Sequence, residues 1–231
     1  MFGFFDPTYM LLVALPTILL SAAAQWFVRS SYSTWLKRRN ATGLAGADVG
    51  HRIAQLAGLR GVKFQAAQGQ LTDHFDPRDN VVRLSADVAQ QPSVASMAIV
   101  AHELGHAQQY AEKSPLIMMR QFLVPAVQLS PNIAYGLIML GFLMRAEPLL
   151  WLGIIAFGVT VVFMLLTLPV EIDASRRGLG LLQEAGLMQS EEDRGGARQV
   201  LTAAALTYVA AAVTSLLTLL YYISLAQRSR D

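Results

Sequence analysis

Two histidines spaced four residues apart are the side chains of this sequence best suited to metal chemistry. They flank an acid in the run His102-Glu103-Leu104-Gly105-His106. Positions i and i+4 lie on one face of an α-helix, so both imidazoles can reach a single metal ion. Glu103 would lie beside that ion, where its carboxylate can take a proton from a water molecule. We therefore expect a zinc site with Glu103 as general base; the alternative is a helix with two partly buried histidines and no metal.

A catalytic zinc ion needs a third protein ligand, and the sequence offers two acids for it. The chain contains no cysteine, so this ligand must be a histidine, an aspartate or a glutamate. Glu171 is the best candidate because it directly follows a long apolar stretch, where an acid is costly unless it is paired or ligating. Asp173 is the rival, but it would lie about 200° around a helix from Glu171, so one regular turn cannot supply both. The alternative role for Glu171 is an ion pair with Arg176 or Arg177.

The histidine motif lies in a segment whose apolar residues recur with the helical period. This pattern predicts a helix from Ser93 to about Glu112. Upstream, the sequence predicts a helix, a strand and a β-hairpin, the last because turn-forming residues separate two apolar runs. The helix covers Ala47–Leu59, the strand covers Val62–Ala66, and the hairpin strands Leu71–Phe75 and Val81–Leu84 flank residues 76–80. We therefore expect a small α+β domain around the motif.

Four long stretches of the chain carry no charged residue. They are residues 7–28, 121–144, 148–170 and 199–227. A membrane-spanning helix needs about 20 mostly apolar residues, so each stretch is long enough to cross a bilayer. Pro125 and Pro131 interrupt the second stretch, which could instead be a re-entrant or interfacial segment. We expect an α-helical integral membrane protein with about four transmembrane helices and a small α+β catalytic domain.

The composition agrees with a membrane protein and excludes several other classes. Hydrophobic residues make up 54% of the 231 residues and charged residues 15%, whereas about a quarter of the residues in soluble proteins are charged. These values exclude a disordered chain and disfavour an ordinary soluble domain. The lack of cysteine excludes a disulfide scaffold, and a net charge of +2 is too small to suggest nucleic-acid binding.

The distribution of basic residues predicts the orientation in the membrane. Every Lys and Arg except Arg145, Arg228 and Arg230 lies in residues 29–120 or 171–198. Four spans would place these two segments on the same side of the bilayer. The positive-inside rule makes that side cytoplasmic.

The first apolar stretch could alternatively be a cleaved signal ending near Ser21–Ala24. Its basic residues follow the apolar run, and only Asp6 is charged before it, which favours an uncleaved anchor. The expected organisation is a first transmembrane helix (1–28), a cytoplasmic catalytic region (29–120), transmembrane helices two and three (121–170), a second catalytic segment (171–198), and a fourth transmembrane helix with a tail (199–231).

Four runs of sequence resemble the YugP-type neutral zinc metallopeptidases, which are bacterial membrane proteins. The runs are Leu71–Pro77, Val82–Ser85, Ala101–Ala107 and Leu168–Arg177. The resemblance covers most of the chain, including the order of apolar spans and motifs. More distantly, the chain is similar to the HtpX heat-shock protease and the prenyl-protein endopeptidases. Those proteins are gluzincins, whose third zinc ligand is a glutamate on a later helix.

This resemblance implies a zincin-type (gluzincin) catalytic domain with its residues in named roles. His102, His106 and Glu171 would be the zinc ligands, and Glu103 would be the general base. The distant relatives carry an aspartate four residues after the ligand glutamate, where this chain has Ser175. A carboxylate that orients a ligand histidine would therefore come from elsewhere, for example from Asp173.

His74 and two arginines are candidates for stabilising the oxyanion of the reaction. His74 could donate a hydrogen bond to that oxyanion, or it could be held in the hairpin by Asp73 or Asp76. Arg176 and Arg177 are alternative donors, although basic residues at the end of a span usually contact lipid headgroups.

Two further features have one functional and one structural interpretation. Asn80–Ser85 is either an edge strand that pairs with an extended substrate or an ordinary buried hairpin strand. His51 is expected to be a surface or packing histidine.

The sequence as a whole predicts a membrane-embedded zinc endopeptidase of the bacterial inner membrane, with its catalytic side in the cytoplasm. Its partners would be a peptide or protein substrate and the lipid bilayer, with no nucleic acid. The alternative is a catalytically silent zinc-binding scaffold or adaptor, which a changed Glu103 would indicate. A transporter or channel is disfavoured because the four apolar stretches contain no ionisable acid or base at their centres.

Overall fold

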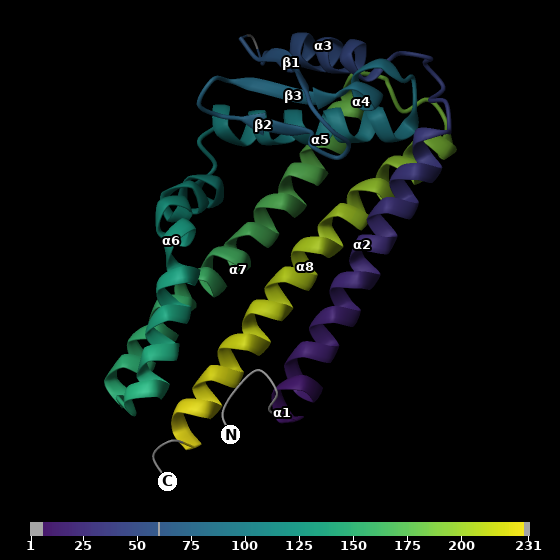
Figure 1. Ribbon diagram of the computed structural model, residues 1–231. Helices are drawn as coiled ribbons and strands as arrows, with labels where there is room; N and C mark the ends of the chain where they lie inside the picture. Colours follow the sequence, from purple (N-terminus) through teal and green to yellow (C-terminus); the bar gives the residue numbers. More distant parts are fainter. Residues whose placement is uncertain (1–6, 60, 229–231) are drawn as a thin grey trace. The chain divides into compact units, whose positions relative to one another are not determined.

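The computed structural model describes residues 7–59 and 61–228 (Figure 1). Over this range the chain is mostly helical, with four long apolar helices and a small three-stranded mixed sheet. Asp6, the first residues of the expected span 1–28 and the last residues of the expected tail lie outside the described residues. The described residues form two compact units: an apolar unit (7–24, 118–169 and 207–228) and a mixed unit (25–59, 61–117 and 170–206).

Four helices are long and apolar enough to cross a membrane, by their length and composition. Each contains one of the charge-free stretches, which confirms the predicted number of long apolar helices. The first comprises α1 (Pro7–Tyr9), the π-helical segment η1 (Met10–Ala14) and α2 (Leu15–Leu36). The others are α6 (Pro115–Met144), α7 (Glu147–Glu184) and α8 (Glu191–Arg228).

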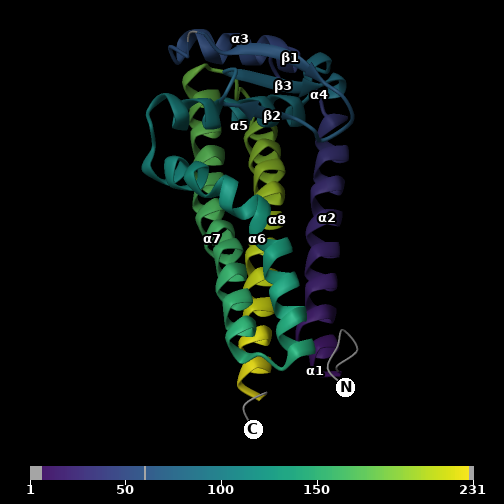
Figure 2. The ribbon, with the colours of Figure 1, turned by 60° about the vertical axis from the view of Figure 1, so that its left-hand side comes forward.

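Within the apolar unit, α6, α7 and α8 share an apolar core. Buried residues of this core include Ala134 and Ile138 on α6, Phe157 on α7 and Tyr222 on α8. The second charge-free stretch is helical throughout, with Pro125 and Pro131 inside α6. Figure 2 shows that α6 bends along its length, as expected where proline removes a backbone donor and crowds the preceding turn.

The sheet of the mixed unit has the strand order β1-β3-β2. Strand β2 (His74–Asp76) pairs antiparallel with β3 (Val81–Ser85), which confirms the predicted hairpin, although its first strand begins at His74 rather than Leu71 and includes Asp76. Strand β1 (Lys63–Ala67) pairs parallel with β3 on its other side. The hypothesis that Asn80–Ser85 forms an edge strand is therefore wrong, because β3 is hydrogen-bonded on both sides. The free edges of this sheet belong to β1 and β2.

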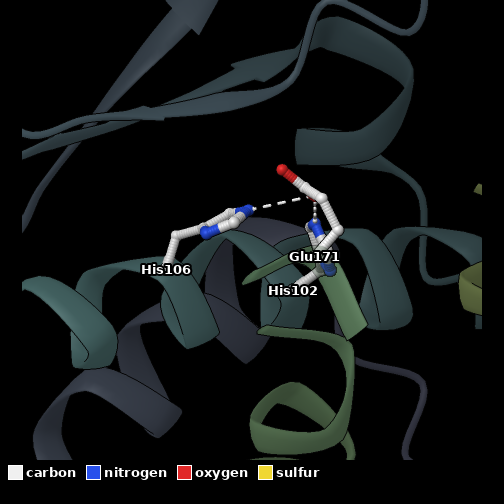
Figure 3. Close-up of side chains that lie close together, drawn as sticks. All are labelled: His102, His106 and Glu171. Carbon is white, nitrogen blue, oxygen red and sulfur yellow. Dashed lines mark ion pairs between the residues drawn. The ribbon is translucent and has the colours of Figure 1, made fainter. Parts of the chain in front are cut away.

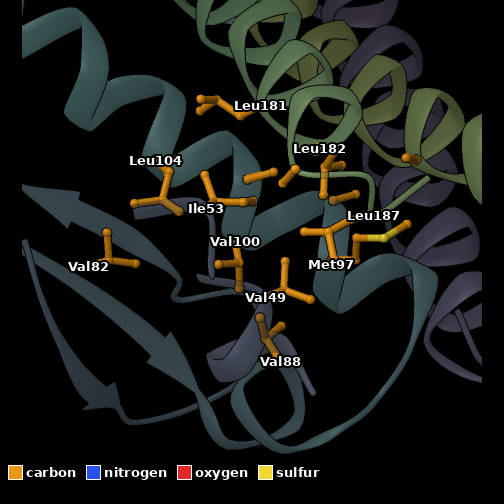
Figure 4. Packing of buried hydrophobic residues seen from close by; sticks show 14 of the residues in the cluster. Val49, Ile53, Val82, Val88, Met97, Val100, Leu104, Leu181, Leu182 and Leu187 are labelled. Carbon is orange, nitrogen blue, oxygen red and sulfur yellow. The ribbon is translucent and has the colours of Figure 1, made fainter. Parts of the chain in front are cut away.

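Two helices cover one face of this sheet, and residues of α7 and α8 complete the core of the mixed unit (Figure 4). Phe64 and Phe75 are both cross-strand partners of Val82, so these three side chains point to the same face. They pack against α3 (Gly46–Leu56) and α5 (Val94–Ala111), as Val49 and Leu104 illustrate. A short helix α4 (Ala86–Gln90) connects β3 to α5. Both predicted helices are thus present: Ala47–Leu59 begins one residue earlier and ends three residues earlier than predicted, and Ser93–Glu112 is one residue shorter at each end.

Candidate metal centre

The candidate site depends on a close approach of α5 and α7 within the mixed unit. Gly105 on α5 lies against the backbone of Ala174 on α7, where an added Cβ would collide with the Ala174 carbonyl. Gly178 on α7 lies against α5 in the same way, since its Cβ would be 2.8 Å from the Ala101 carbonyl oxygen. Two glycines therefore let the two backbones touch. This contact brings Glu171, one helical turn before Ala174, to the histidines of α5.

Three side chains converge where the two helices meet (Figure 3). Glu171 Oε2 lies 3.3 Å from His102 Nε2 and 3.4 Å from His106 Nε2. The candidate ligand atoms of all three residues lie within 4.8 Å of one another. The glutamate is almost fully enclosed, with 3% of its side chain exposed, whereas the two histidines expose 13% and 12%. The site is thus closed on the side of α7 and open enough at the imidazoles to be reached.

These distances fit the geometry of a zinc ion. Zinc binds imidazole nitrogen and carboxylate oxygen at about 2.0–2.2 Å, so two ligand atoms of a tetrahedral site lie about 3.4 Å apart. The two nitrogen–oxygen distances match this value. Two imidazoles and one carboxylate also form a ligand set typical of catalytic zinc, which leaves the fourth position for water or substrate.

The charge of Glu171 makes the centre attractive to a cation. Burial alone would raise the pKa of Glu171, but His102 and His106 donate hydrogen bonds to it when they are protonated at Nε2 and so lower this pKa below its ordinary value. The carboxylate is therefore ionised at neutral pH. Burial would also lower the pKa of His106, yet the Glu171 carboxylate beside the ring, together with Glu103, raises it. The pocket therefore favours positive charge, whether a proton on the imidazole or a metal ion.

Glu103 is buried and its carboxylate is held by the edge strand. Glu103 Oε2 accepts a hydrogen bond of 2.8 Å from the backbone N–H of Phe75 in β2. Because this N–H points to Glu103, it is not used in the ladder with β3. Glu103 therefore contacts the free edge of the sheet while lying on the same helix as His102 and His106.

The second nitrogen of each histidine contacts a residue that the sequence analysis did not assign. His102 Nδ1 lies 3.2 Å from the hydroxyl oxygen of Ser175, and His106 Nδ1 lies 3.0 Å from Gln109 Oε1. Helical spacing could have indicated both, because Ser175 follows Glu171 by four residues and Gln109 follows His106 by three. Asp173 is not one of the three clustered residues and accepts hydrogen bonds from Gln109 and Arg177 instead.

The other candidate residues have described contacts of their own. His74 is exposed, and its Nδ1 donates to the backbone carbonyl of Thr72 at 2.7 Å rather than to Asp73 or Asp76. Its role as oxyanion donor stays a prediction. The His51 ring packs on Phe64, with the ring centroids 4.5 Å apart, which is a packing role.

Of the two arginines, Arg177 is engaged in ion pairs and Arg176 is exposed. Arg177 Nε lies 2.7 Å from Asp173 Oδ2, and Arg177 Nη1 lies 2.7 Å from Glu112 Oε2. The guanidinium therefore bridges the C-terminal end of α5 and α7, and neither pair involves Glu171. The contacts of Glu171 with His102 and His106 take the place of the ion pair with Arg176 or Arg177 that the sequence left open.

Known proteins match nearly the whole of this chain. A profile of the family described as "Putative neutral zinc metallopeptidase" matches residues 9–227. The protein described as "Putative membrane protease YugP" of Bacillus subtilis is 38% identical over 212 residues, which is 92% of this chain and 94% of that protein. No solved structure matches the chain. The extent of both matches shows that the chain belongs to this family of neutral zinc metallopeptidases.

Proposed function

We propose that the protein is a membrane-embedded zinc endopeptidase that hydrolyses peptide bonds of a peptide or protein substrate near the cytoplasmic face of the bacterial inner membrane. The observation that carries this proposal is the convergence of His102, His106 and Glu171 at zinc-compatible distances, with Glu103 on the same helix. Family membership supports the reaction class, and the matched membrane protease supports the location.

In this proposal His102, His106 and Glu171 hold the zinc ion. Zinc bound there would supply a Lewis acid that polarises the scissile carbonyl and makes water a better nucleophile at neutral pH. Glu103 would take a proton from the attacking water and deliver it to the leaving amine. The hydrogen bond from Phe75 fixes one carboxylate oxygen of Glu103 and leaves the other for this proton transfer.

Strand β2 would bind the substrate by its free edge. This proposal is supported by the hydrogen bond from the Phe75 N–H to Glu103, the expected general base, at this edge. An extended peptide that pairs with β2 would therefore run past Glu103, and it would use outward backbone groups of this edge other than the Phe75 N–H, which Glu103 already accepts. His74 lies next to Phe75 in this strand, and we retain it as the candidate oxyanion donor.

The membrane arrangement follows from the four long apolar helices and the distribution of basic residues. The helices would cross the bilayer, and the segments rich in Lys and Arg, which carry the candidate site, would face the cytoplasm. The chain has no cysteine, so a single introduced thiol reports topology without background. In intact cells, Asp79→Cys should resist a membrane-impermeant maleimide, while the matched variant Ala146→Cys should be labelled. The opposite pattern would invert the orientation.

The decisive experiment compares Glu103→Gln with wild type in a detergent-purified, zinc-loaded preparation. Glutamine keeps the size of the side chain but cannot take the proton, so cleavage should fall by about 10²–10⁴-fold. Zinc content and melting temperature should stay near wild-type values. The probe is a proteome-derived peptide mixture in which mass spectrometry identifies new termini, and exposed Glu184→Gln is the matched control.

Two outcomes would count against the proposal. Zinc-dependent cleavage by Glu103→Gln at the wild-type rate would show that the base lies elsewhere. A wild-type protein that binds zinc yet yields no zinc-dependent new termini would favour the alternative of a catalytically silent zinc-binding scaffold or adaptor.

A further inference from the structure

Gln109 occupies an unusual position for a glutamine, because 1% of it is exposed and its whole amide is hydrogen-bonded. Its Nε2 donates to the Val170 carbonyl at 2.9 Å and to Asp173 Oδ2 at 2.8 Å. Its Oε1 lies 3.0 Å from His106 Nδ1. A buried polar side chain is retained at low cost only when such partners satisfy it.

The partners of Gln109 determine which way its amide points. A backbone carbonyl and an ionised carboxylate can only accept hydrogen bonds, so the NH2 group must face Val170 and Asp173. The amide oxygen must then face His106, and an oxygen in that place can only accept. His106 Nδ1 therefore carries a hydrogen and donates it to Gln109.

This assignment fixes the tautomer of a metal ligand. When Nδ1 of a neutral imidazole carries the hydrogen, the lone pair is on Nε2, which is the atom of His106 that faces Glu171. We propose, on the basis of the function proposed above, that Gln109 is a positioning residue that holds His106 in the zinc-binding tautomer and orientation.

Gln109 also ties this histidine to the segment that supplies the third ligand. Its bond to the Val170 carbonyl reaches the residue directly before Glu171. Its second hydrogen goes to Asp173 Oδ2, which also accepts from Arg177, and Arg177 bridges to Glu112 at the end of α5. One glutamine thus couples a ligand on α5 to the backbone beside a ligand on α7. A ligand histidine commonly donates its second N–H to a carboxylate or carbonyl, and losing such a partner typically costs 10–100-fold in metal affinity.

The test compares Gln109→Met with Gln108→Met in purified full-length protein. Gln108 is the adjacent residue on α5, and no side-chain hydrogen bond of it is found among the described residues. Zinc affinity is measured by competition with a chromophoric chelator, and the melting temperature of the zinc-free protein is measured separately. Zinc affinity should fall about 10–100-fold in Gln109→Met and stay within about threefold of wild type in Gln108→Met. The visible spectrum of the cobalt-substituted protein should change only in Gln109→Met.

A second substitution guards against a simple folding defect. Gln109→Glu keeps the length of the side chain and an oxygen that can accept from His106 Nδ1, but it loses the NH2 group that donates to Val170 and Asp173. Zinc affinity in Gln109→Glu should therefore exceed that of Gln109→Met, even where the zinc-free protein melts at a lower temperature.

The results distinguish this inference from the proposed function. If Gln109→Met lowers only the melting temperature of the zinc-free protein and keeps wild-type zinc affinity, Gln109 is merely structural and the inference is wrong. Failure of Gln109→Glu to bind zinc better than Gln109→Met would also overturn it. If wild-type protein itself binds no zinc, the proposed function fails and this inference fails with it.

Discussion

The two units of the molecule differ in how far their apolar side chains are exposed. In the mixed unit, Ile53 and Leu104 are enclosed by protein, with 1% and 0% exposed (Figure 4). In the apolar unit, Phe122 and Leu143 each expose 82% of their surface. Only 11–33% of the most apolar window of each long helix is buried. The mixed unit can therefore be stabilised by removing apolar groups from water, whereas the apolar unit leaves surface that another apolar phase must cover.

The residues that could bind a metal ion also lie in one unit rather than in both. All four histidines of the chain belong to the mixed unit, and the three metal-site residues are brought together within it. A protein-enclosed core can hold Glu171 as a charge because hydrogen bonds compensate its burial. The mixed unit thus encloses the cluster that could hold a metal ion, and the apolar unit provides apolar surface of the length needed to cross a bilayer.

Removing one histidine of the cluster should abolish zinc binding by the mixed unit. His106→Ala should reduce bound zinc from about one ion per chain to nearly none, because it removes one of three protein ligands. His51→Ala is the control, since His51 packs on Phe64 away from the cluster and should keep its zinc. Metal analysis by mass spectrometry checks both variants. Unchanged zinc in His106→Ala would place the metal site elsewhere.

A second prediction concerns the free energy of unfolding and compares an enclosed side chain of the mixed unit with an exposed one of the apolar unit. Ile53→Ala should destabilise the protein by about 2–5 kcal/mol, because it leaves a cavity in an enclosed core. Leu143→Ala removes a similar volume from an exposed position and should cost less than about 0.5 kcal/mol. Urea unfolding in lipid micelles, followed by circular dichroism, measures both. Equal losses in the free energy of unfolding would show that Leu143 is packed against protein as tightly as Ile53.

Much of this architecture could be predicted from local patterns in the sequence. Charge-free stretches identify the four long helices, and the histidine spacing identifies the face of α5 that carries the site. The pairing of β1 with β3 could not be predicted, because a parallel register depends on how the chain returns in space rather than on local periodicity. The edge-strand hypothesis for Asn80–Ser85 failed for the same reason.

The parts of the site that the sequence hides are those that act between helices. Gly105 looks like a variable position inside the motif, yet only a residue without a Cβ lets Ala174 approach. Gln109 looks like a surface residue of α5, yet it is buried and bonded to α7. In each case the partner on α7 that explains the residue type lies about 60 or more positions away in the chain. Local propensity carries no information about such partners.

Widening the close contact between α5 and α7 should reduce stability and zinc affinity by a smaller amount. In Gly178→Ala, the new Cβ would lie 2.8 Å from the Ala101 carbonyl oxygen and 3.0 Å from the His102 backbone nitrogen. These are backbone atoms, and moving them costs free energy, so the variant should lose about 1–3 kcal/mol of stability and bind zinc more weakly.

Gly180→Ala is the control on the same helix, because no described atom lies within 4 Å of its added Cβ. Gly180→Ala should be neutral or stabilising, since alanine favours helices. Equal stability and zinc affinity in the two variants would exclude a tight crossing.

The stability of the hairpin that holds Glu103 should depend slightly on acid pH. Arg83 donates a hydrogen bond of 2.6 Å to Asp76 at the end of β2, and this bond, with the Arg78 backbone N–H, lowers the pKa of Asp76. A carboxyl group whose pKa is lower in the folded state stabilises the fold above its ordinary pKa of about 4, and this stabilisation is lost as pH falls below that value.

Asp76→Asn should therefore lower the melting temperature slightly at pH 7 and flatten its decline below pH 4. The pair is partly exposed, so added salt should weaken the difference. Asp79→Asn is the matched control, because Asp79 contacts the same arginine at a longer distance of 3.2 Å and should have less effect. Thermal unfolding of zinc-free protein at several pH values avoids any contribution from metal release. If Asp76→Asn declines below pH 4 as steeply as wild type, the acid sensitivity comes from groups other than this hairpin. In that case the position of β2 over Glu103 would depend on apolar packing, chiefly of Phe75 against Tyr110.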